Sequence, residues 1–118
     1  MVTLTAQKIV LGGVTPSYAA SDVAGETFSN TGDVFLHVKN GDASPHNVTI
    51  VTQATTVDKE GYGSITLSSE VIAVANAGEE MIGPFPQSRF NDPSGDVSIT
   101  YDDVTSMTVA LIKLPKVQ

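Results

Sequence analysis

The chain has 118 residues, no cysteine, and 13 acidic against six basic residues, which gives a formal net charge of −7. A single domain of this length buries roughly two thirds of the surface that its unfolded chain exposes, so it can fold without a disulfide or a structural metal. The missing cysteines exclude disulfides and thiolate chemistry, and the scattered basic residues argue against a protein that wraps a phosphate backbone.

The beginning of the sequence carries no targeting signal that we can identify. Met1 to Thr5 lack the basic start that precedes the apolar run of a signal peptide. No run approaches the ~20 apolar residues that span a bilayer. We therefore expect a protein that is made and folded in the cytoplasm and has neither a nucleic acid nor a membrane as partner.

The composition favours strands over helices. Val, Ile and Thr together number 35, against six Leu, and β-branched side chains pack well on a pleated sheet. Apolar and polar residues alternate with period two from Val2 to Thr5, Val34 to Lys39, Val48 to Ile50 and Val97 to Tyr101. Nine runs, some of which can merge into a total of seven or eight strands, have strand character: residues 2–10, 25–29, 33–39, 47–54, 64–67, 69–75, 79–85, 96–102 and 106–114. Residues 17–26 have a helical alternative.

Turn residues separate these runs at short intervals. Glycine, asparagine and aspartate tolerate the backbone conformations of tight turns, and they recur at Gly12-Gly13, 30–33, 40–42, 61–63, 76–78 and 92–95. The run from Met107 to Leu114 is apolar on both faces, which is typical of a strand covered on both sides or at an interface. We predict an all-β fold: a single-domain antiparallel β-sandwich, jelly-roll-like, over residues 1–118, with residues 1–25 as an N-terminal arm or an edge strand.

The candidates for chemistry are few. His37 is expected in the middle of a strand, in a cross-strand polar contact, and His46 in a solvated loop after Pro45. The pairs Glu79-Glu80 and Asp102-Asp103 are adjacent, so on a strand each pair points to opposite faces and cannot share one acid–base site. We expect no catalytic residue and no enzymatic activity.

A calcium site is the main alternative to a purely structural reading of the loops. Asn91, Asp92 and Asp96 gather oxygen ligands around one turn, and Asp102 or Asp103 can approach from the end of the next strand. The loop lacks the EF-hand pattern, and the turn itself explains Asn, Asp, Pro and Gly at these positions. We expect no metal and no cofactor.

The segment from Met81 to Phe90 differs from the rest of the chain. Two prolines remove hydrogen-bond donors and stiffen the backbone, so it cannot be a central strand. Either it folds its aromatic side chains over one end of the core, or it is a rigid apolar arm for a neighbouring subunit. The candidate partner interface consists of Met81, Ile82, Pro84, Phe85, Pro86, Arg89 and Phe90.

A resemblance runs through residues 33–114. A strand that ends in Asn40-Gly41 is followed by the Val- and Thr-rich run 48–52, the Gly83-Pro84-Phe85-Pro86 segment, the Asn91-Asp92 turn and a closing β-hairpin. This pattern resembles small virion structural proteins of tailed bacteriophages, the head decoration or cement proteins. The resemblance implies a β-sandwich without catalytic or ligand residues.

The resemblance implies a function as well. The expected protein bridges and stabilises major capsid subunits on the outer surface of the virion capsid, and it is a homo-oligomer, with a trimer favoured over a dimer. The alternatives are a neck, tail or fibre-attachment protein of the virion, or a small carbohydrate- or calcium-binding β-module.

Overall fold

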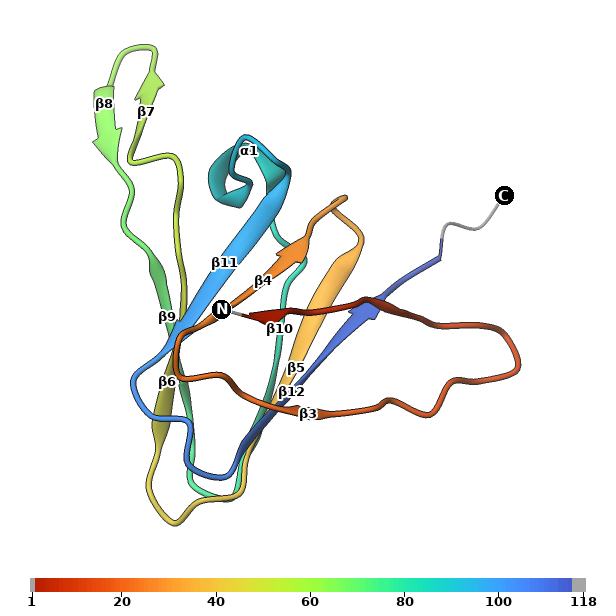
Figure 1. Cartoon of the computed structure of the whole chain (residues 1–118). Helices are drawn as coiled ribbons and strands as arrows, with labels where there is room; N and C mark the ends of the chain where they lie inside the picture. The colour runs from red at the N-terminus through yellow and green to blue at the C-terminus, as the bar shows by residue number, and fades with distance from the viewer. Residues whose placement is uncertain (1, 116–118) are drawn as a thin grey trace.

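The computed structural model, which describes residues 2–115, confirms the predicted β-sandwich (Figure 1). One sheet has the strand order β1 (Val2–Thr3), β4 (Glu26–Ser29), β11 (Asp96–Tyr101), β6 (His46–Ile50) and β9 (Glu70–Val74). The other has the order β10 (Glu79–Ile82), β5 (Val34–Asn40), β12 (Met107–Lys113) and β2 (Gln7–Lys8), and β3 (Ala19–Ala20) also pairs with β12. Neighbouring strands are antiparallel, except that β1 runs parallel to β4 and β2 parallel to β12.

The core lies between the inner faces of the two sheets. Its side chains come from alternate positions of the strands, as the period-two pattern predicts. On β11, Val97 and Ile99 are fully buried while Thr100 is exposed. The buried apolar side chains of the core are Phe28, Val34, Leu36, Val38, Val48, Ile50, Val74, Phe85, Phe90, Val97, Ile99, Met107, Val109 and Leu111.

β12 is apolar on both faces because both faces are covered. It pairs along its whole length with β5, from Met107 opposite Asn40 to Lys113 opposite Val34. On its outer face, Ala110 and Ile112 are only 2% and 5% exposed, and Ile9, Val14 and Pro16 from the N-terminal part of the chain line a pocket together with Ile112. The strands β2 and β3 pair with the edge of β12. The sequence allowed either a strand covered on both sides or a strand at an interface. The structure places β12 between β5 and β2 in the sheet, with both faces covered.

Residues 9–18 form a loop between β2 and β3, which we call the N-terminal loop. It leaves the sandwich and returns to it, as the long excursion beside β12 in Figure 1. Ser17 to Glu26, for which a helix was an alternative, instead contains β3 and a turn before β4. Residues 1–25 were expected to be an arm or an edge strand; the described part supplies the short strands β1, β2 and β3 and this loop.

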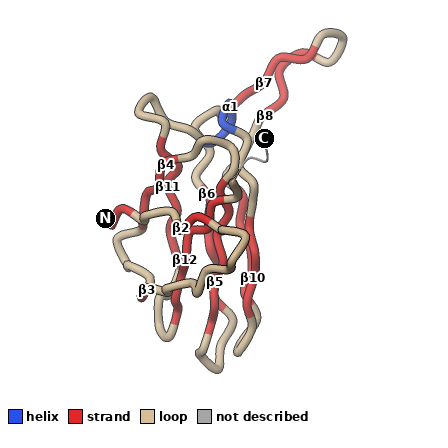
Figure 2. The backbone as a smooth tube through the Cα atoms, turned by 90° about the vertical axis from the view of Figure 1, so that its right-hand side faces the viewer, coloured by secondary structure: helices blue, strands red, loops and turns tan. Residues whose placement is uncertain are grey.

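A second excursion is a hairpin made of β7 (Thr56–Lys59) and β8 (Gly63–Thr66), which form a two-stranded sheet of their own. Figure 2 shows it projecting from the body of the sandwich. The run 47–54 was expected to be one strand, but β6 ends at Ile50 and the chain then turns out into this hairpin. β7 was not predicted.

The segment from Met81 to Phe90, which we call the proline-rich segment, starts in the last two residues of β10. The expected strand 79–85 stops at Ile82, since Gly83 has a φ of +132° and Pro84 lacks an N–H. A side chain at Gly83 would collide with the neighbouring strand, because an added Cβ would lie 2.9 Å from Phe35 Cβ. The Gly83–Pro84 peptide is cis, and the segment closes with a single helical turn, α1 (Gln87–Phe90).

Candidate interaction surfaces

The predicted interface from Met81 to Phe90 divides into two parts. Phe85 and Phe90 are only 4% and 5% exposed, and the Phe85 ring lies 5.3 Å from that of Phe28 and 6.3 Å from that of Phe90. These two side chains close one end of the core. Met81, by contrast, is 68% exposed.

The remaining members of the predicted interface lie at or near the surface. Pro84 and Pro86 are exposed, and Ile82 and Arg89 are half-buried. Contact of these residues with a partner stays a prediction. The two aromatic side chains are accounted for by packing within the chain.

Arg89 connects the proline-rich segment to the base of the β7–β8 hairpin. Its guanidinium donates to the Ser68 carbonyl oxygen at 2.7 Å and lies 3.4 Å from a Glu70 carboxylate oxygen. Its own carbonyl oxygen accepts the N–H groups of Gln53 and Ala54 at 2.9 and 3.1 Å. Arg89 therefore holds both arms of the hairpin where they leave the sandwich, a role that the sequence did not indicate.

The hairpin presents apolar side chains to solvent. All eight strand residues of β7 and β8 are exposed. Val57 and Ile65, which are cross-strand partners, are 37% and 42% exposed, and Tyr62 at the turn is 85% exposed. A two-stranded hairpin is marginally stable in water by itself. Contact of its exposed apolar side chains with a partner surface would therefore stabilise it.

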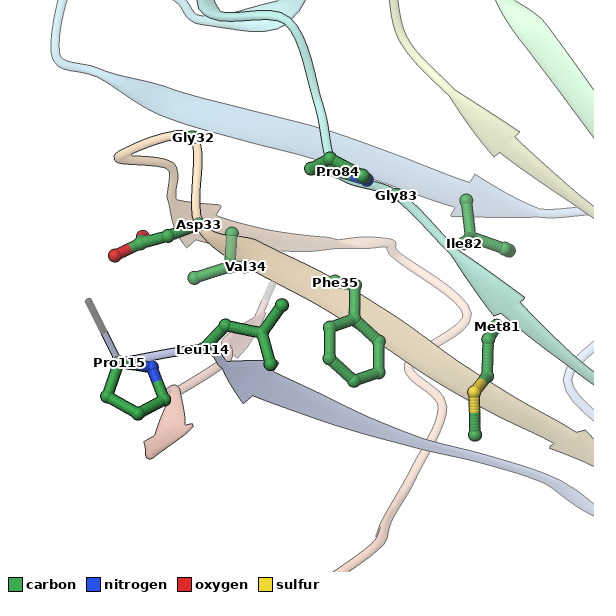
Figure 3. Close-up of a pocket in the computed structure, with 10 residues that line it drawn as sticks. All are labelled: Gly32, Asp33, Val34, Phe35, Met81, Ile82, Gly83, Pro84, Leu114 and Pro115. Atoms are coloured by element: carbon green, nitrogen blue, oxygen red, sulfur yellow. The ribbon is translucent and has the colours of Figure 1, made fainter. Parts of the chain in front are cut away.

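An apolar groove lies on the outer face of the sheet that contains β10, β5, β12 and β2. We call it the apolar groove, and Phe35, Met81 and Leu114 are its main apolar side chains. Figure 3 shows the Phe35 ring between Leu114 on one side and Met81 on the other. The groove has a volume of about 350 Å³, and Gly83 and Pro84 form part of its wall. Asp33 also lines it, and its carboxylate lies 3.9 Å from the Lys113 ammonium group.

A second pocket, of about 320 Å³, continues the apolar groove under the N-terminal loop. Phe35 and Met81 line both pockets. Ile9, Val14 and Pro16 of the N-terminal loop form the other wall of the second one. The base of the loop thus covers part of the outer face and leaves the rest open.

The N-terminal loop is closed at its neck by side-chain hydrogen bonds. The Gln7 amide donates to the Ser17 carbonyl oxygen and accepts the Ser17 N–H, both at 2.7 Å. Tyr18 Oη lies 2.6 Å from His37 Nδ1, and Lys39 Nζ lies 4.0 Å from the centre of the Tyr18 ring. A loop whose ends are held together in this way is a compact surface element of the kind that frequently carries function.

The tip of the N-terminal loop is apolar and exposed. Leu11 is fully exposed and Val10 is 51% exposed. Gly13, with a φ of +96°, makes the turn that presents them, and its N–H donates to the Val10 carbonyl oxygen at 2.9 Å. No charged residue occurs from position 9 to position 21, which is unusual for an exposed segment of so acidic a chain.

The two histidines are both buried. His37 lies mid-strand as predicted, and besides Tyr18 it faces Glu79, with 3.3 Å between Nε2 and the carboxylate. His46 was expected in a solvated loop, but it is the first residue of β6 and 3% exposed. The carboxylates of Asp42 and Asp103 lie 3.0 and 3.9 Å from its two ring nitrogens.

Among residues 2–115, Asp42, His46 and Asp103 form a group whose spacing would admit a metal ion, with one ligand atom from each within 4.8 Å of the others. These side chains also organise the loops that they come from. Asp103 accepts the N–H and the hydroxyl of Thr105, and the backbone hydrogen bond in particular holds the pKa of this carboxyl below its usual value. In the turn of residues 91–96, where calcium was the alternative to a metal-free turn, Asp92 Oδ1 accepts the N–H groups of Ser94 and Asp96.

A carboxyl group in the core was not predicted. Glu26 is fully buried on β4, where it accepts a hydrogen bond from the Tyr101 hydroxyl through one oxygen, while its Oε2 has no hydrogen-bond partner. Burial raises the pKa of Glu26 and, with this hydrogen bond, the pKa of Tyr101. The sequence holds one signal for it: on a strand, Glu26 lies on the same face as Phe28, two residues later, and that face is the inner one.

Comparisons with protein-family models, with characterised proteins and with solved structures find no match to this chain. Within residues 2–115, no helix is long and apolar enough to cross a membrane.

Proposed function

We propose that this protein is a non-enzymatic structural protein of a phage head, a decoration or cement protein that binds the outside of the assembled capsid and bridges major capsid subunits. The observation that carries the proposal is the β7–β8 hairpin. It projects from the sandwich, it exposes Val57, Tyr62 and Ile65, and Arg89 holds its base. The resemblance of residues 33–114 to decoration proteins supplies the identity of the partner.

The hairpin suits a protein that works by contact area. A sandwich anchors the base, so the exposed side chains of the hairpin reach beyond the body of the molecule and can enter a seam between two partner subunits. An exposed tyrosine such as Tyr62 is one of the usual anchors of such contacts. A homo-oligomer, with a trimer favoured over a dimer, would repeat the contact and multiply weak binding into stable attachment.

Cosedimentation with phage heads that lack decoration tests the proposal. The wild-type protein should pellet with assembled heads and stay in solution with unassembled capsid subunits. Ile65→Asp should abolish pelleting, since it places a charge in the apolar contact. Val71→Asp is the matched control: Val71 is also an exposed aliphatic residue, 59% accessible, but lies on edge strand β9.

Two outcomes would overturn the proposal. One is a wild-type protein that ignores assembled heads, and the other is equal pelleting with heads and with free subunits. Equal losses for Ile65→Asp and Val71→Asp, with both variants folded, would show that the hairpin is not the contact. Binding to purified necks or tails in place of heads would assign the protein to the virion positions that are the alternative.

A further inference from the structure

We propose that this chain associates head to tail with copies of itself, with the tip of the N-terminal loop of one copy seated in the apolar groove at Phe35, Met81 and Leu114 of the next. The inference does not depend on the partner that the hairpin binds. It follows from two complementary surfaces on one chain, an exposed apolar tip and an open apolar groove.

The tip is available to another molecule and not to its own groove. Leu11 is fully exposed, so in its own chain it packs against nothing. The hydrogen bonds between Gln7 and Ser17 and the contact of Tyr18 with His37 fix the neck of the loop on the sheet. No residue of the loop is among those that line the groove, and the loop residues that line the second pocket are Ile9, Val14, Pro16 and Tyr18, not Leu11. The arrangement is preorganised for binding in trans, which lowers the entropic cost of association.

The groove offers a site of matching chemistry. Its volume of about 350 Å³ accommodates a leucine side chain, and it remains open beside the part of the sheet that the loop base already covers. Met81 is 68% exposed and Leu114 is 51% exposed, so contiguous apolar surface is left in water there. Contiguous exposed apolar surface of this kind commonly marks a protein interface.

The charge distribution permits a second copy as the occupant at these two surfaces. Two molecules with a formal charge of −7 each repel one another over most of their surfaces. The loop has no charged residue from position 9 to position 21, and the Asp33 carboxylate at the groove lies 3.9 Å from the Lys113 ammonium group. The tip and the groove are therefore surfaces through which two such acidic molecules can meet without placing unbalanced carboxylates against each other.

The two surfaces differ, so the contact is heterologous and each copy uses both. Such contacts close into a ring if the rotation between copies permits, and otherwise continue as an open chain. A stable interface buries at least ~1,200 Å², and one loop tip in one groove falls below that. We therefore expect weak, concentration-dependent association, half complete on the order of 10–100 µM.

Sedimentation velocity on the full chain, from about 5 to 500 µM, tests the proposal. The wild-type protein should move from monomer to larger species over this range. Leu11→Asp and Met81→Asp should each shift the transition to at least tenfold higher concentration. Val23→Asp, at a residue that is 78% exposed outside both surfaces, should behave as wild type. Unchanged melting temperatures would establish that the variants are folded.

Mixing separates this interface from other kinds of self-association. Leu11→Asp retains an intact groove and Met81→Asp retains an intact tip, so an equimolar mixture can form one intact contact between the two variants. The mixture should form dimers at concentrations at which each variant alone is monomeric. A wild-type protein that is monomeric throughout would assign the groove to a different partner and overturn the proposal. A mixture that stays monomeric, or a loss in Val23→Asp equal to that in Leu11→Asp, would overturn it as well.

Discussion

Ile99 provides the most direct test of the register of the sandwich. It is fully buried on β11, where its Cα lies opposite Ile50 on one side and Glu26 on the other. Ile99→Ala removes buried methyl groups and leaves a cavity, which costs about 2–5 kcal/mol of the free energy of unfolding. Ile99→Val removes less and should cost about 0.5–1.5 kcal/mol. The adjacent Thr100 is exposed on the other face, so Thr100→Ala should cost under ~1 kcal/mol.

Urea and thermal unfolding followed by circular dichroism measure these differences. For a domain of this size, each 1 kcal/mol lowers the melting temperature by roughly 3–6 °C, so a cost of about 2–5 kcal/mol should lower the melting temperature of Ile99→Ala by roughly 6–30 °C. If this variant is unfolded at 25 °C, Ile99→Val keeps the comparison measurable. The urea slope should stay the same, since the surface exposed on unfolding is unchanged. Equal effects at positions 99 and 100 would refute the assignment of inner and outer faces.

Two further predictions concern ionisable groups. Because burial raises the pKa of Glu26, the folded state binds this proton more tightly than the unfolded chain, and the stability that it contributes is lost as the pH rises from about 4.5 through the folded pKa. Glu26→Gln should therefore gain in melting temperature relative to wild type between pH 4 and pH 8, and a difference independent of pH would contradict this. Excess chelator, followed by millimolar Ca²⁺ or Zn²⁺, should change the melting temperature by less than about 5 °C. A larger rise that Asp103→Asn removes would instead locate an ion at Asp42, His46 and Asp103.

The strands could be predicted from the sequence because period two and β-branched composition are local signals. Val97 to Tyr101 alternates throughout, and Val34 to Lys39 alternates except at the apolar Phe35. Both runs lie in strands with the expected face inward. β7 was missed, since Thr56 to Lys59 contains one strongly apolar residue and all four side chains face solvent. A strand that buries neither face leaves no alternation to detect.

The interaction surfaces could be predicted only in part, because they depend on pairing between distant segments. The interface was predicted as one continuous segment, Met81 to Phe90. In the structure, Phe85 and Phe90 of this segment lie in the core, while Met81 lies at the surface. The apolar groove joins Phe35, Met81 and Leu114 from three separate strands or their ends, a neighbourhood set by sheet order. Arg89 reaches the hairpin base through a helical turn that follows two prolines. Contacts of this kind join segments that are distant in the sequence, so they leave no periodic pattern of apolar residues from which they could be predicted.

Part of the proline-rich segment is buried in the core and part is exposed, and only variants at the exposed residues can test binding without unfolding the protein. A charge at Phe85 would lie in the core against Phe28, so loss of binding in Phe85→Asp would report unfolding as readily as a lost contact. Met81, Leu11 and Ile65 are exposed, and charges there leave the core intact.

The hairpin and the N-terminal loop leave the sandwich at different places, as Figures 1 and 2 show. The two proposed contacts therefore use different parts of the molecule. The two proposals fail independently: a protein that self-associates through Leu11 but ignores capsids keeps the loop–groove contact and loses the decoration function. A monomer that binds heads through the hairpin does the reverse.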